Sequence, residues 1–290
     1  MNIIVLPHQG LGDQLIINGY INHLLLNTDI EHITIIAKQY QEKTLKHLYS
    51  DTTRVSFFFI NLSNEMCSDD IWTTIPLLRV INKMPFNTTL YINDKLYYLH
   101  TFGMHSNLMP FVIEGKNWAD SFYLRAGVDP SLRYTLFKLP SNLERSNYLY
   151  TLLKEKLQYD KYILIHDDPS RERVIRSELV KKILEENSTL DLPIIYLGKN
   201  REKYPFIEGL HNIELSDFFS NGSLLDLYHI ILNAAECHFM DSSIACLTDT
   251  MDNVNSRLYL HYYLTETGGG CAETSVGEIH SKRKWTYFHT

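Results

Sequence analysis

The sequence has few cysteines and no long apolar run, and both shortages exclude large classes of protein. Only four of its 290 residues are cysteines, and they stand far apart without a C-x-x-C pair, so neither a disulfide framework nor a zinc knuckle is expected. It has no stretch of about 20 apolar residues and no basic leader with a small-residue cleavage site, which predicts a cytoplasmic chain without a transmembrane helix. Peripheral contact with a membrane surface stays open.

Several catalytic signatures are missing as well. There is no D-x-D triplet that could bridge a metal to a diphosphate, no H-E-x-x-H and no G-x-S-x-G. The first glycine-rich loop lacks the third glycine of a dinucleotide fingerprint, and no Walker A sequence occurs. A net charge of −7 gives no sign of a nucleic-acid partner. We therefore expect neither a metal nor a nicotinamide cofactor.

What the sequence does contain is an alternation of strands and helices, with 44% hydrophobic and 21% charged residues. Apolar runs predict strands at 3–6, 32–37, 55–60, 95–99, 161–166, 193–197, 212–215, 236–240 and 257–261. Helical periodicity is found at 13–25, 39–49, 71–81, 116–128, 142–157, 178–186 and 224–235. This pattern predicts an α/β chain with two parallel, doubly wound sheets, in Rossmann-like domains at 1–150 and 151–290.

The first predicted strand ends in the loop HQGLGDQ. Gly10 and Gly12 permit a tight turn and a close approach of a ligand to the backbone. Asp13 follows at the start of the next helix, where a carboxylate is a good cap. It could also act as a general base that takes a proton from an acceptor hydroxyl, and His8 could serve the same role or orient the acceptor. The two interpretations of Asp13 are compatible.

The second strand end is ILIHDDPSRERVIR, where His166 leaves the strand and Arg171 and Arg173 follow. This is either a solvated charged loop or a clamp for phosphate, because the planar fork of arginine suits diphosphate oxygens.

The third strand end is ECHFMDSSIACLTDTM. Asp241, Ser242 and Ser243 precede a helix, so they form either an ordinary N-cap or a site for an anion at the helix N-terminus. Lys199, after the strand PIIYL, could contact a phosphate or a base.

Together these strand ends resemble the GT-B glycosyltransferases. GLGDQLIINGYINHL is similar to the N-terminal loop of heptosyltransferases, which carry L-G-D, and of fucosyltransferases, which carry a GLGNQL-type stretch. MDSSIACLTDTM resembles a segment of the C-terminal domain of those enzymes, in which an acidic or polar residue and Ser precede a helix. Residues 118–140 resemble the end of the N-terminal domain in small viral and bacterial members. IHDDPSRER stands where fucosyltransferases carry an H-x-R-R-x-D-like element, but Asp167 and Asp168 replace its arginines, which argues against a GDP-fucose donor.

The resemblance implies two Rossmann-like domains that face a cleft, with a nucleotide-sugar in the second and a glycan or other hydroxyl acceptor in the first. Asp13 matches the L-G-D aspartate that acts as the base, and Ser242 and Ser243 match the diphosphate-binding turn. Arg171 or Arg173 would replace a metal in neutralising the leaving nucleoside diphosphate. The implied activity is a metal-independent, inverting transfer of a sugar, as in polysaccharide biosynthesis.

Two other functions fit the same residues. A nucleotide-sugar epimerase on this fold would need further acid and base groups, for which His8, Asp13 and His166 are candidates. A ligand-binding module without catalysis needs none of them. Hydrolysis of a donor separates the enzymes from the module, and a transfer product separates a transferase from an epimerase.

Overall fold

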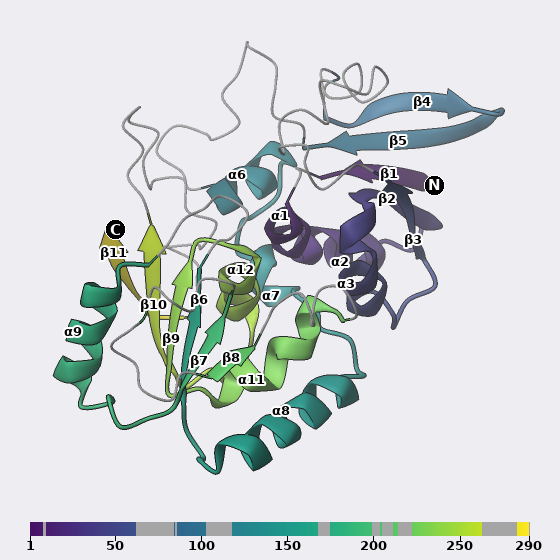
Figure 1. Cartoon of the computed structure of the whole chain (residues 1–290). Helices are drawn as coiled ribbons and strands as arrows, with labels where there is room; N and C mark the ends of the chain where they lie inside the picture. The colour runs from purple at the N-terminus through teal and green to yellow at the C-terminus, as the bar shows by residue number, and fades with distance from the viewer. Residues whose placement is uncertain are drawn as a thin grey trace. The chain divides into compact units, whose positions relative to one another are not determined.

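The chain folds into two α/β units, seen in a computed structural model (Figure 1). The structure describes residues 1–7, 10–61, 84, 86–102, 118–167, 175–198, 204, 211–213, 222–262 and 283–289. The first unit comprises Met1–Ser141 and Ala272–His280, and the second comprises Asn142–Cys271 and Ser281–Thr290. The expected alternation of strands and helices is confirmed in both units, while the helix predicted at 71–81 lies outside the described residues.

The first unit is built on a five-stranded sheet with the order β3-β2-β1-β5-β4. Its strands are β1 (Asn2–Leu6), β2 (His32–Lys38), β3 (Val55–Ile60), β4 (Thr88–Ile92) and β5 (Lys95–Thr101). Its helices are α1 (Leu11–Ile16), α2 (Asn18–Leu26), η1 (Gln39–Gln41), α3 (Glu42–Leu48), α6 (Trp118–Arg125) and α7 (Leu132–Thr135). Strand β1 pairs in parallel with β2 on one side and with β5 on the other, so the strand order reverses beside β1. Ligands of such sheets bind at the carboxyl ends of the strands near this reversal.

One prediction for this sheet was wrong, because it is not wholly parallel. Strand β4, which the sequence analysis did not anticipate, pairs antiparallel with β5 in a hairpin. Asn93 and Asp94 form its turn with φ of 48° and 60°. Two successive residues with positive φ match the twist of an antiparallel hairpin, and Asn and Asp tolerate that conformation better than most residues.

The helix expected at 13–25 is broken at Ile17 into α1 and α2. The backbone oxygen of Ile16 accepts a hydrogen bond of 2.6 Å from the Tyr123 hydroxyl, which satisfies this carbonyl where the first helix ends. Gly19 in α2 then allows α7 to approach closely, since a Cβ atom there would lie 2.3 Å from the carbonyl oxygen of Leu132.

The second unit is built on a six-stranded sheet with the order β11-β10-β9-β6-β7-β8. Its strands are β6 (Ile163–His166), β7 (Ile194–Leu197), β8 (His211–Ile213), β9 (Glu236–Met240), β10 (Arg257–Tyr262) and β11 (Trp285–His289). Its helices are α8 (Glu144–Leu157), α9 (Ser177–Asn187), η4 (Leu224–Leu227), α11 (Tyr228–Asn233) and α12 (Ser243–Thr250). All its neighbouring strands pair in parallel. The order is that of a dinucleotide-binding Rossmann sheet, with the switch point between β6 and β9.

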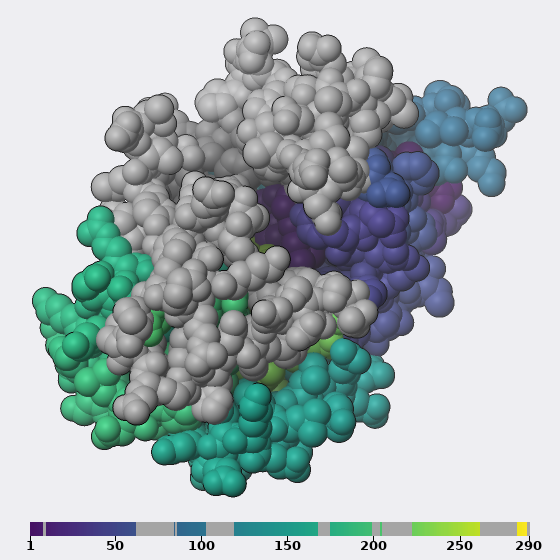
Figure 2. All heavy atoms as spheres, viewed as in Figure 1, coloured from purple at the N-terminus to yellow at the C-terminus, as the bar shows by residue number. Residues whose placement is uncertain are grey.

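The core of this unit explains why its strands form where they do. Strands β6 and β7 are fully buried, and Ile163, Ile165 and Ile194 pack against Val180 and Leu184 of α9. Helix α8 instead lies at the surface, as Figure 2 shows, and its buried residues are Ser146, Leu153 and Leu157. No helix in the described ranges is long and apolar enough to cross a membrane.

Candidate functional site

Four predicted site residues of the second unit lie together at the switch point of its sheet: His166, Asp241, Ser242 and Ser243, here the switch-point cluster. His166 is the last residue of β6 and is 5% exposed. Its Nδ1 lies 3.4 Å from the Oγ of Ser242, which follows the neighbouring strand β9. The structure thus brings together two residues that are 76 positions apart in the sequence.

Ser242 does not behave as the ordinary cap that one interpretation expected. It occupies the N-cap position of α12, but its side chain makes no capping hydrogen bond. Its hydroxyl instead contacts His166, while Ser243 begins the helix. The first turn of a helix leaves backbone N–H groups without helical partners, and these groups and the helix dipole favour an anion. Ser242 is half-buried, so part of its surface is exposed.

Asp167, next to His166, is not part of a solvated loop. It is 1% exposed, and its carboxylate accepts three hydrogen bonds. Oδ1 accepts from the backbone N–H of Ile175 and from the Tyr204 hydroxyl, each at 2.9 Å, and Oδ2 accepts from the Tyr196 hydroxyl at 2.8 Å. The carboxylate therefore joins the end of β6 to the residues that follow and to β7, and its role is structural.

The basic residues predicted at this site fall outside the described residues. They are Arg171, Arg173 and Lys199, and the phosphate clamp built on them stays a prediction. The glycine before Lys199 is described: a Cβ atom on Gly198 would lie 2.6 Å from the ring of Tyr196. Gly198 thus makes room for the tyrosine that holds Asp167.

In the first unit, Asp13 lies in α1, just after the carboxyl end of β1. Its Oδ2 accepts a hydrogen bond of 2.7 Å from the backbone N–H of Gly10, so it caps the helix from its third position and not from the N-cap. Asp13 is 8% exposed. Gly10 has an extended backbone (φ −86°), so the turn does not need a glycine there, but a Cβ atom would lie 3.1 Å from Asp13 Oδ2. Gly12 lies inside α1, and His8 falls outside the described residues.

A group of polar side chains beside Asp13 escaped the sequence analysis. Gln14 Nε2 donates to Gln41 Oε1 at 3.4 Å, which joins the start of α1 to the residues after β2. Gln41 Oε1 also accepts from the Lys38 backbone N–H at 3.1 Å, and Gln41 Nε2 donates to the Tyr40 hydroxyl at 3.2 Å. Gln14 follows β1 and Gln41 follows its parallel neighbour β2. This placement after two adjacent strands is the sequence signal that could have identified them.

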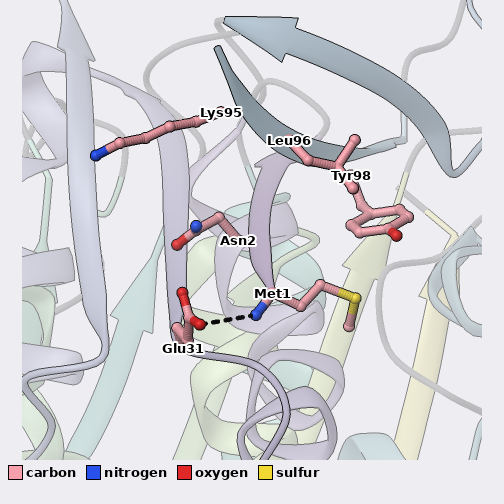
Figure 3. Close-up of a pocket in the computed structure, with 6 residues that line it drawn as sticks. All are labelled: Met1, Asn2, Glu31, Lys95, Leu96 and Tyr98. Carbon is pink, nitrogen blue, oxygen red and sulfur yellow. Dashed lines mark ion pairs between the residues drawn. The ribbon is translucent and has the colours of Figure 1, made fainter. Parts of the chain in front are cut away.

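A pocket of about 480 Å³ lies at the end of this sheet where β1 and β5 begin, opposite the end near Asp13 (Figure 3). Its lining residues are Met1, Asn2, Glu31, Lys95, Leu96 and Tyr98, and the Met1 amino group forms an ion pair of 3.5 Å with Glu31. This pocket lies at the amino ends of β1 and β5, whereas sheets of this type bind ligands at the carboxyl ends. We assign it no role.

Within the described residues, no group of three or more His, Cys, Asp or Glu side chains is placed to hold a metal ion. Cys237 and Cys246 are both buried, and burial raises the pKa of the Cys237 thiol to about 12. Cys67 and Cys271 lie outside the described residues.

Comparisons with known proteins identify the fold. The sequence matches no protein-family model and no curated protein. A glycosyl transferase family 9 structure from Veillonella parvula DSM 2008 is similar, with a TM-score of 0.59 and 11% identity, over 100% of this chain and 86% of that chain. For E. coli ADP-heptose LPS heptosyltransferase II, the TM-score is 0.48 with 12% identity, over 99% and 90% of the two chains. For E. coli heptosyltransferase WaaC with ADP, it is 0.49 with 9% identity, over 100% and 93%. The first likeness confirms the expected GT-B fold with two Rossmann-like domains.

Proposed function

We propose that this chain is a metal-independent, inverting glycosyltransferase that moves a sugar from a nucleotide-diphosphate donor to a hydroxyl of a saccharide. The observation that carries the proposal is the contact between His166 and Ser242 at the switch point of a parallel sheet with the Rossmann order. Nucleotide diphosphates bind at such points, beside the N-terminus of the helix that follows a strand. The fold likeness to the glycosyl transferase family 9 structure supports the reaction class.

The switch-point cluster would hold the diphosphate of the donor. The Ser242 hydroxyl and the N–H groups of the first turn of α12 would donate to its oxygens, and His166 would fix the direction of that hydroxyl. Negative charge grows on the diphosphate as the bond from the sugar C1 to the phosphate oxygen breaks, and preformed donors stabilise that charge. Arg171, Arg173 and Lys199 would add positive charge, while Asp241 would contact the sugar or the nucleoside.

Asp13 would act as the base in the first unit. Its carboxylate would take the proton of the acceptor hydroxyl while the hydroxyl oxygen forms the new bond to C1, and the nucleoside diphosphate leaves with the electrons of the broken bond. The hydrogen bond from Gly10 fixes the carboxylate without protonating it. Gly10 and Gly12 would let the acceptor approach the backbone, and His8 is the alternative base.

A panel of nucleotide-sugars tests the donor half of this proposal. UDP-, GDP-, ADP-, CMP- and dTDP-sugars are added to the protein with EDTA, and its melting temperature is measured. A donor at a hundredfold excess over its Kd stabilises the fold by about 2.7 kcal/mol, so one series should raise the melting temperature. Ser242→Ala should weaken that shift, whereas Ser177→Ala, at the first position of α9, should not. If no nucleotide-sugar gives a shift, the donor site is wrong.

A catalytically silent binding module is the second candidate, because the capping bond between Gly10 and Asp13 is also what a structural aspartate would make. Mass spectrometry of a saccharide library incubated with the donor that binds separates the two. A product heavier by one sugar, with release of the nucleoside diphosphate, supports the transferase. Donor binding with neither hydrolysis nor product supports the module.

A further inference from the structure

An exposed aromatic ring stands beside the Asp13 carboxylate in the first unit. Asp13 follows β1, and Tyr40 follows β2, its parallel neighbour in the sheet. The hydrogen bond of 3.4 Å between Gln14 and Gln41 joins the residues that adjoin each of them. Tyr40 is 56% exposed, although it belongs to a group of hydrogen-bonded polar residues.

The Tyr40 ring is held in a fixed direction although more than half of the residue is exposed. Gln41 is fully buried, and its amide is oriented by the Lys38 backbone N–H, so its Nε2 presents a fixed donor to the Tyr40 hydroxyl at 3.2 Å. The Lys38 ammonium lies over one face of the ring, 5.8 Å from the centroid and within the range of a cation–π contact, so a ligand would stack on the other face. A ring held by its hydroxyl loses little further freedom when a ligand binds.

The Tyr40 hydroxyl also interacts electrostatically with Asp13. Desolvation of this hydroxyl raises the pKa of Tyr40, the hydrogen bond from Gln41 lowers it, and the nearby negative charge of Asp13 raises it again. Asp13 is therefore close enough to act electrostatically on the edge of the ring. A ligand that covers the ring would bring its own polar groups to the proposed base.

We propose that the face of the Tyr40 ring opposite Lys38 is the platform on which the acceptor saccharide stacks. A pyranose has an apolar face of C–H groups and a rim of hydroxyls, so it matches a flat aromatic surface that is bordered by amide and ammonium groups. Stacking would place one rim hydroxyl toward Asp13. This inference rests on the proposed function, in which Asp13 is the base. The stacking of a saccharide on Tyr40 requires neither the donor nor catalysis.

Saturation-transfer difference NMR without a donor tests the platform directly. The probes are the methyl pyranosides of glucose, galactose, mannose and N-acetylglucosamine, added to the full chain. We expect transfer to the ring C–H protons of at least one probe in the wild type and in Tyr40→Phe. In Tyr40→Ala the signal should fall about fivefold or more, because the aromatic contact is lost. Tyr91→Ala is the matched control, since Tyr91 is 77% exposed on the β4–β5 hairpin, whose side chains are seen at the surface in Figure 2.

The outcomes separate this inference from the proposed function. No saturation transfer to any probe in the wild type, or an unchanged NMR signal in Tyr40→Ala, would contradict the proposed stacking on Tyr40. If an acceptor is found, its KM should rise about tenfold in Tyr40→Ala and stay within about threefold in Tyr40→Phe, since tenfold corresponds to the loss of one good contact. Saccharide binding at Tyr40 without any sugar transfer would keep the platform and refute the transferase. Sugar transfer with an unchanged acceptor KM in Tyr40→Ala would support the transferase activity and refute the stacking platform.

Discussion

The Nδ1 atom of His238 lies 3.3 Å from the Nε2 atom of His261 in the interior of the second unit. The two residues lie on the neighbouring strands β9 and β10, and both are fully buried. Glu236 Oε2 lies 3.6 Å from the other nitrogen of His238. If His238 carries its proton on Nε2, which faces the Glu236 carboxylate, then its Nδ1 is an acceptor. The proton between the two rings is then on Nε2 of His261. Both histidines are then neutral, which suits their burial.

These histidines should make the second unit sensitive to acid. Burial lowers the pKa of both, and the adjacent His238 lowers the pKa of His261 further. In the unfolded chain they take up protons near pH 6.5, so stability is fully present above that pH and falls as the pH decreases toward the folded pKa values. Hydrogen exchange of β9 and β10, corrected for the intrinsic rate, should show increased opening between pH 6.5 and 5. His261→Phe should make this dependence shallower, and an unchanged slope would contradict the assignment.

A third histidine, His100 in the first unit, allows a numerical test. His100 accepts or donates a hydrogen bond of 2.8 Å with the Tyr20 hydroxyl, and burial lowers the pKa of His100 to about 4. Because the folded pKa is below the ordinary value of about 6.5, the unfolded chain takes up a proton at a higher pH than the folded chain. The free energy of unfolding therefore falls as the pH decreases from 6.5 to 4, by about 3 kcal/mol in total. The proton chemical shift of the His100 ring, followed against pH, should titrate near 4. A midpoint near 6.5 would show that the ring is not buried in this way.

The strands were the easiest part of the fold to predict, because a fully buried parallel strand reads as a continuous apolar run. Ile163–His166 and Ile194–Leu197 are examples. Strand β4 was missed because its hairpin depends on two residues with positive φ, and the pair Asn93–Asp94 is a weaker turn signal than Asn-Gly. No pattern predicts that Glu236 and His238 lie wholly buried in a central strand, since only their partners across the sheet make that burial tolerable.

The candidate site was partly predictable for a related reason. Strand ends followed by small or polar residues identified Ser242 and His166, and the Rossmann strand order makes those two ends neighbours. The burial of Asp167 was not predicted, because its partners Tyr196 and Tyr204 are distant in sequence. Tyr40 carries no motif at all, and its exposure and its bond to Gln41 are visible only in three dimensions.

Gly19 should not tolerate alanine, although alanine favours helices by about 1 kcal/mol. The added Cβ atom would lie 2.3 Å from the carbonyl oxygen of Leu132 and 2.9 Å from the Cα of Arg133, and backbone atoms cannot turn aside as a side chain can. Helix α7 would have to move away from α2, at a net cost of about 1–3 kcal/mol. Urea unfolding measures this. Leu26→Ala, at the 68% exposed end of α2, is the control and should stay within about 0.5 kcal/mol.

The carboxylate of Asp167 should matter more for stability than for the reaction. Asp167→Ala leaves three donors without their acceptor in a buried place, which should cost about 3 kcal/mol or more. Tyr196→Phe removes one of those donors and should cost about 1 kcal/mol. Thermal unfolding with a donor-binding measurement on each folded variant distinguishes the two effects. If Asp167→Ala keeps the wild-type melting temperature and loses donor binding, then Asp167 contacts the ligand and our structural assignment is wrong.

Asp13→Asn separates the two roles that the structure allows for this residue. Asparagine keeps a side-chain oxygen that can accept the Gly10 N–H, so the cap survives and the melting temperature should change little. It cannot take a proton at neutral pH, so kcat should fall about 10²–10⁴-fold if Asp13 is the base. The control is Asp226→Asn, in the capping box of η4, where Asp226 Oδ2 accepts from the Ser223 N–H at 3.0 Å and from Arg145 Nε at 2.8 Å. Loss of the ion pair with Arg145 should lower the melting temperature of this variant, but kcat should stay near that of the wild type. Near wild-type transfer in folded Asp13→Asn would make Asp13 a cap alone and would move the role of base to His8, which His8→Gln would then test.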